Sequence, residues 1–255
     1  PALHVDKAQI VGSAGGQEYG YRLYVRQPRP DFELRVVPSS IIARPGSCAA
    51  ITVHALRRDG FTGEIPLELE DAPPGFALQG ALVPANQDKV RLTLMVPPKP
   101  TKEPVTLELG GKVALRGGRK LSHIAVPAED WMQAFAYRHL VPAKEWTVSV
   151  SGKGVFRPPL HYGKEDRVKL PNNGAPTRLV FFPTAKQNVQ NLRLELSEPM
   201  DGVAIQSQTA EEGSVTVVMT VDGKKVKAGV SGNLIFLAFR EYIPMTAEGK
   251  PLPPQ

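Results

Sequence analysis

Four residues between positions 123 and 139 combine imidazole and carboxylate groups, the chemistry of a metal site. They are His123, Glu129, Asp130 and His139. Imidazole nitrogens and carboxylate oxygens suit zinc or manganese, so a metal-dependent hydrolase accessory domain is one hypothesis. None of the five His residues lies in an H-E-x-x-H pattern. The alternative is that these four side chains are surface or hydrogen-bonded residues at a junction between domains.

Aromatic residues suggest a second kind of site, a platform on which sugar rings stack. The candidates for carbohydrate binding are Trp131, Tyr137 and Tyr162. Tyr162 lies in an expected loop beside His161, so we expect it to be the most exposed of the three. The competing interpretation is that such aromatic residues pack in a core or at a junction.

Nucleophilic catalysis has little support in the sequence. No G-x-S-x-G motif is present, and the single cysteine, Cys48, follows a Pro-Gly turn where a strand should begin. We interpret Cys48 as a small buried hydrophobic residue rather than a reactive thiol. One cysteine also excludes an internal disulfide framework. We therefore expect a non-catalytic protein without a cofactor.

Structural calcium stays open as an alternative, because acidic residues recur in the expected loops. These are Asp59, Glu64, Asp71, Asp88, Asp166, Asp201 and Asp222. No D-x-D-x-D-G run accompanies them, and acids are common in turns because their side chains bond to nearby backbone amides.

The charge of the chain does not indicate nucleic-acid binding. The net charge is +6 and the calculated pI is about 9.4. The densest basic clusters lie beside glycines, and acidic residues are interleaved with them, so no continuous cationic stripe with aromatic residues is formed. The longest apolar run, Leu234–Phe239, is far shorter than the roughly 20 residues that span a membrane.

The chain predicts an all-β fold of tandem immunoglobulin-like β-sandwich domains. Apolar and polar residues alternate in short runs such as 32–36, 51–56, 90–96, 146–150 and 215–221, with Gly, Pro or Asp between them. Gly110-Gly111 is expected to separate two strands. Asp222-Gly223 is expected to close a two-residue hairpin before a strand at 225–230, because this pair favours the positive φ angles of such turns.

Little helix is expected. The segment 128–135 is the exception, since Trp131 and Phe135 have helical spacing and Pro127 suits a first helical turn. Phe135, Tyr137, His139 and Val141 also alternate as in a strand, so both interpretations stay open.

The predicted organisation has five parts. Residues 1–30 are terminal strands of an upstream β domain with a linker, 31–127 a first sandwich and 128–142 a junction. Residues 143–245 are a second sandwich and 246–255 a flexible tail. Because the chain opens with Pro1 and has no signal segment, we interpret it as a piece of a longer polypeptide.

Two stretches carry a resemblance to known modules. Residues 18–25 followed by 29–34 resemble the end of a bacterial pre-peptidase C-terminal domain that runs into an appended domain. Residues 57–65, with Pro73-Pro74-Gly75-Phe76, resemble immunoglobulin-like modules of large exported proteins of planctomycete-type bacteria. The resemblance implies a secreted or cell-envelope, multidomain protein, and it carries no catalytic residues across.

The expected function is therefore a structural or interaction module that acts as a spacer or docking surface. Its expected partners are other domains of the same longer chain or other envelope proteins, and polysaccharide in the carbohydrate-binding alternative. Nucleic acid and a membrane span are not expected.

Overall fold

The prediction of an all-β fold is confirmed. The computed structural model describes residues 26–115, 117–133, 137–156, 158–163, 167–185 and 189–240. These residues contain eighteen strands and no helix. Accordingly, no helix that could cross a membrane is found in the described part of the chain. The assignment to the immunoglobulin-like class stays a prediction.

Two sheets form a first sandwich over residues 31–150. One has the order β11 (Tyr137–Pro142), β10 (Val126–Gln133), β1 (Asp31–Val37), β3 (Cys48–Arg58), β7 (Lys89–Met95) and β5 (Ala77–Gln79). The other has the order β2 (Ser40–Ala43), β12 (Trp146–Val150), β8 (Val105–Ala114), β4 (Ile65–Glu70) and β6 (Leu82–Val83), with β9 (Lys120–Ile124) paired to β8. Inward-facing residues of both sheets share one core.

Strand β1 shows why these sequences form a sandwich. Phe32, Leu34 and Val36 are buried, while the residues between them are half-buried. Since successive side chains of a strand point to opposite faces, this alternation turns one apolar face to the core.

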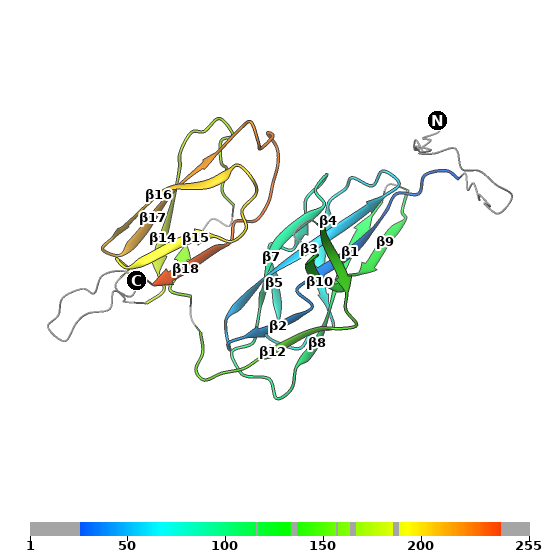
Figure 1. Ribbon diagram of the computed structural model, residues 1–255, viewed down its shortest axis with the longest axis horizontal. Helices are drawn as coiled ribbons and strands as arrows, with labels where there is room; N and C mark the ends of the chain where they lie inside the picture. The colour runs from blue at the N-terminus through cyan, green and yellow to red at the C-terminus, as the bar shows by residue number, and fades with distance from the viewer. Residues whose placement is uncertain are drawn as a thin grey trace.

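A smaller second sandwich occupies residues 160–240. Its four-stranded sheet has the order β13 (Leu160–Tyr162), β14 (Thr177–Pro183), β17 (Ser214–Val221) and β16 (Val203–Glu211). A two-stranded sheet is formed by β15 (Leu192–Leu196) and β18 (Phe236–Arg240). Figure 1 shows the two groups of strands side by side, with the chain passing from one to the other after β12.

The predicted domain boundary differs from the structure. The expected junction, 128–142, contains a hairpin of β10 and β11, and β10 extends the first sandwich by pairing with β1. Trp146, Val148 and Val150 were expected to open the second sandwich. They are buried in the first core instead, because β12 pairs with β2 and β8.

The helical turn expected near 128–135 does not form over the described residues, where β10 runs to Gln133. Cross-strand pairing with β11 satisfies the backbone of this segment, so the alternating pattern prevails over the helical spacing. Phe135 lies outside the described residues, as do residues 1–25 and 241–255, which include the expected tail.

Two glycine predictions were wrong. Gly110 and Gly111 lie inside β8 rather than between strands. A Cβ on Gly111 would stand 2.7 Å from Leu34 Cδ1 and 2.9 Å from Ile65 Cγ2, so glycine is needed there for close packing of the two sheets.

The Asp222-Gly223 turn is not a two-residue hairpin. Asp222 Oδ1 accepts a hydrogen bond from Lys224 N at 2.9 Å, and the Asp222 carbonyl accepts from Lys225 N at 3.0 Å and Val226 N at 2.9 Å. These bonds coil the chain after β17, and the next strand is β18.

Candidate functional site

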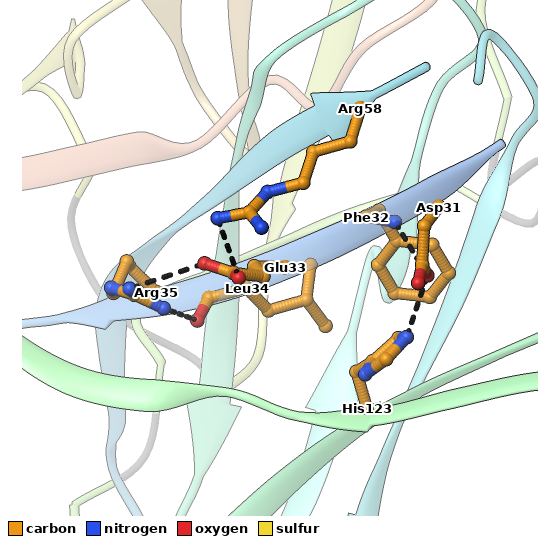
Figure 2. A network of polar contacts seen from close by, with 7 residues as sticks. All are labelled: Asp31, Phe32, Glu33, Leu34, Arg35, Arg58 and His123. Carbon is orange, nitrogen blue, oxygen red and sulfur yellow. Dashed lines mark hydrogen bonds and ion pairs between the residues drawn. The ribbon is translucent and has the colours of Figure 1, made fainter. Parts of the chain in front are cut away.

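His123, the first of the four metal candidates, forms a hydrogen bond between strands. His123 Nε2 on β9 lies 2.7 Å from Asp31 Oδ1, at the start of β1 (Figure 2). The imidazole also meets the Phe32 ring edge-on, at 5.0 Å between centroids. Desolvation acts to raise the pKa of Asp31, but the Phe32 amide, His123 and Arg119 outweigh it and lower that pKa.

The polar face of β1 also carries ion pairs. Glu33 Oε1 lies 2.7 Å from Arg58 Nη2, and its Oε2 lies 3.4 Å from Arg35 Nη2 (Figure 2). The Glu33–Arg58 pair joins β1 to β3, whereas the Glu33–Arg35 pair lies within β1. His123 therefore forms part of a network that holds strands together.

The other three metal candidates have separate partners. Glu129 Oε1 accepts hydrogen bonds from Ser39 N, at 3.0 Å, and from Ser39 Oγ. Asp130 Oδ2 lies 3.4 Å from Arg138 Nη1. The His139 ring stacks with the Tyr137 ring at 6.5 Å between centroids.

The structure thus does not bring the four metal candidates together. In the described part of the chain, no group of three or more His, Cys, Asp or Glu side chains could hold a metal ion.

Several of the candidate calcium-binding acids contact basic groups. Asp59 Oδ2 lies 2.5 Å from Arg26 Nη1, Asp88 Oδ1 3.7 Å from Arg57 Nε, and Asp201 Oδ1 2.9 Å from Lys225 Nζ. Asp222 bonds to its own turn, as described above. Asp166 lies outside the described residues. Structural calcium stays an untested alternative.

The three carbohydrate candidates fall in two different places. Trp131 and Tyr137 lie on the β10–β11 hairpin and are exposed. Tyr162 was expected to be the most exposed, but it packs against the second core, with its ring 5.5 Å from that of Phe181. Pairing of β13 with β14 places these two residues opposite each other, which explains the difference.

A set of contacts that the sequence did not indicate connects the two sandwiches. Arg91 on β7 donates to Ser197 Oγ from Nη2, at 2.9 Å, and lies 2.9 Å from Glu198 Oε1 through Nη1. Asn233 Nδ2 donates to the carbonyls of Gly80, at 2.8 Å, and Arg91, at 2.9 Å.

We name these contacts the Arg91–Asn233 interface, together with the bond from Gln87 Nε2 to the Ser231 carbonyl at 2.6 Å. Sequence reasoning missed it because Arg91 occupies a solvent-facing position of an alternating strand. Asn233 lies in a loop, because β18 begins only at Phe236.

Comparison with known proteins does not assign the chain to a family. No family model matches the chain, and no curated protein matches it. The structure is similar to that of domains 5–6 of the S-layer protein SbsC, at 13% sequence identity and a TM-score of 0.34. The match covers 82% of this chain and 98% of that one.

Proposed function

We propose that this chain is a non-catalytic structural module of a larger secreted or cell-envelope protein, in which two β-sandwiches together act as a stiff spacer. The observation that carries the proposal is the Arg91–Asn233 interface. It gives the second sandwich defined contacts on the first, beyond the single chain connection.

The backbone at Arg91 is fixed by core packing on either side of it. Its neighbours Val90 and Leu92 are buried in the first core, so the strand that carries Arg91 is fixed. The guanidinium bonds to Ser197 and Glu198, which follow β15 of the second sandwich. A guanidinium presents several donors in one plane, so contacts with two adjacent residues restrict rotation as well as distance.

Asn233 makes the reciprocal contact. Its amide nitrogen reaches two backbone carbonyls of the first sandwich, on Gly80 and Arg91. Gly80 has φ +72°, and a Cβ there would lie 2.3 Å from Asn233 Nδ2. The absence of a side chain at position 80 therefore permits this close approach.

The number and polarity of these contacts suit a spacer. Neighbouring domains move relative to each other by default unless an interface holds them. Each partly exposed hydrogen bond contributes about 1 kcal/mol or less, so the set together favours one arrangement without making it irreversible.

Solution scattering tests the spacer role. We expect the wild-type scattering curve to fit the two sandwiches in the arrangement seen in the structure. The double variant Arg91→Ala/Asn233→Ala should have a larger radius of gyration, because its sandwiches separate. Lys89→Ala, which removes a cation from the same strand, is the matched control. A wild-type curve that already requires separated sandwiches would contradict the proposal.

The proposed location is supported by the resemblance of residues 57–65 to exported modules and requires its own test. Native cells are fractionated and probed with an antibody against this chain. We expect a band in the envelope or medium, at a mass well above the 27.7 kDa of the present sequence. A cytoplasmic band at that mass would exclude the location and leave the measured rigidity unaffected.

A further inference from the structure

The β10–β11 hairpin extends beyond the sheet that carries it. Only Val126 and Pro127 of β10 pair with β1, opposite Arg35 and Val36. From Ala128 onward β10 pairs with β11 alone, and β11 is the last strand of its sheet. Both faces of the outer hairpin are therefore available for exposure.

One face of this hairpin carries the aromatic residues. Trp131 lies opposite His139, and Tyr137 lies opposite Gln133. Because side chains alternate along a strand, Trp131, Tyr137 and His139 share one face. Trp131 is 64% exposed and Tyr137 is 68% exposed. The Tyr137 and His139 rings lie 6.5 Å apart between centroids with an interplanar angle of 28°, so they form one aromatic cluster beside Trp131. We name these three residues the aromatic face.

The charged side chains near the aromatic face are already engaged. Asp130 and Arg138 pair with each other on the opposite face of the hairpin. Glu129 shares the aromatic side, but its Oε1 accepts two hydrogen bonds from Ser39 at the base of the hairpin. The aromatic face therefore favours a neutral ligand over an anionic or cationic one.

The size of the face also limits its occupant. The exposed parts of Trp131 and Tyr137 amount to about 300 Å², taking 150–250 Å² for a whole aromatic side chain. A stable protein interface needs about 800 Å² from each partner. Two or three sugar rings match the aromatic face better than a second copy of this chain.

From these observations we infer that Trp131, Tyr137 and His139 bind a neutral polysaccharide built from pyranose rings. The apolar C–H face of a pyranose stacks on an aromatic ring, whose π-face is electron-rich. His139 and the Trp131 indole N–H supply polar groups that orient a ligand among apolar contacts. This inference does not depend on the spacer role.

The two tryptophans of the chain provide an internal comparison for the test. Trp131 is exposed, whereas Trp146 is 1% exposed in the first core. Quenching of fluorescence by acrylamide therefore reports on Trp131, while Trp146 gives a protected background. The probes are soluble glucan and mannan, with polygalacturonate as an anionic polymer of similar ring structure.

We expect glucan or mannan to protect Trp131 from acrylamide and to shift its emission to shorter wavelength, with little effect of polygalacturonate. Trp131→Ala should weaken the affinity measured by calorimetry at least tenfold. Phe239→Ala is the matched control, because it removes a half-exposed aromatic residue from the second sandwich. Its affinity should equal that of the wild type.

Three results would overturn the inference. The first is no protection and no heat of binding with either neutral polymer. The second is binding that Trp131→Ala leaves unchanged while its melting temperature matches that of the wild type. The third is a concentration-dependent dimer that Trp131→Ala dissociates, which would assign the aromatic face to a second copy of the chain.

Discussion

The two sandwiches differ mainly in how much apolar surface they bury. Among the described residues, the first core contains 23 buried hydrophobic residues, of which Trp146 and Phe32 are the largest that are fully buried. The second core contains 8, of which Phe181 and Met219 are among the larger. Since apolar burial is the dominant favourable contribution to folding, the first sandwich should be the more stable.

The second sandwich compensates with polar contacts. Its β15–β18 sheet has two strands, and a two-stranded sheet is marginal without further packing. Gln208 of β16 accepts from Leu194 N, at 2.8 Å, and donates to the Leu192 carbonyl, at 2.6 Å. One side chain thus attaches β15 to the larger sheet. The stability of the second sandwich therefore depends on a few specific side chains and on contacts with the first sandwich.

The largest expected effect is in the first core. Trp146→Ala should lower the free energy of unfolding of the first sandwich by about 3–5 kcal/mol, because it leaves a large cavity. Trp146→Phe fills most of the space and should cost clearly less. Urea unfolding followed by circular dichroism measures both. Equal losses for the two variants would show that packing volume is not the cause.

Met219→Ala should act on the second sandwich alone. Met219 is fully buried on β17, between β14 and β16, and its truncation should cost about 2–5 kcal/mol. With so few core residues, this loss should unfold the second sandwich at temperatures where the first stays folded. Trp146 fluorescence should therefore keep its wild-type transition. A matching shift of that transition would contradict the difference between the two cores.

Gln208→Ala should have an intermediate effect. It removes the bonds to the Leu192 carbonyl and the Leu194 amide, and the loss should be about 1–2 kcal/mol. Hydrogen exchange should rise at β15 and β18 before it rises at β17. Gln206→Ala, at an exposed position of the same strand, is the control. Unchanged exchange in Gln208→Ala would show that β15 is held by its apolar residues.

The smallest expected effect is a pH dependence in the first sandwich. Because the pKa of Asp31 is lowered in the folded state, the folded protein binds a proton at Asp31 less tightly than the unfolded protein does. The pKa of Asp31 in the unfolded protein is near 3.8. Its contribution is therefore complete above about pH 5 and is lost as the pH falls below 3.8. Both side chains of the Asp31–His123 pair are 35% exposed, so this contribution is about 0.5 kcal/mol.

Urea unfolding of Asp31→Asn and of the wild type at pH 6 and pH 2.5 measures the contribution of the Asp31 charge to the free energy of unfolding. The two proteins should differ at pH 6 and converge at pH 2.5. Glu103→Gln, at an exposed position, should show no such convergence. A difference for Asp31→Asn that is the same at both pH values would exclude a role for its charge.

The alternation of apolar and polar residues predicted the strands, because the apolar positions mark the side of each strand that packs against a core. It could not predict which core: Trp146, Val148 and Val150 have the same pattern whichever sandwich they enter. It also could not show that position 111 has no room for a side chain, since that depends on Leu34 and Ile65, far away in sequence.

The candidate sites were predicted only in part. Trp131 and Tyr137 were identified by type, and the strand register then placed them on one face with His139. The metal hypothesis relied on closeness in sequence, but the side chains at 123 and 129 bond to separate partners, Asp31 at the start of β1 and Ser39 in the bend between β1 and β2. Arg91 and Asn233 gave no local signal, because their partners belong to another sandwich.

The fixed arrangement of the two sandwiches is the central claim, and a distance distribution between them tests it most directly. The single cysteine, Cys48, was expected to be buried, but it is exposed at the start of β3 and therefore accepts one spin label. Glu212→Cys, in the turn between β16 and β17, supplies the second site. Pulsed electron paramagnetic resonance should give one narrow distance distribution, which Arg91→Ala/Asn233→Ala broadens. A distribution that is already broad without those two substitutions, and unchanged by them, would contradict the account.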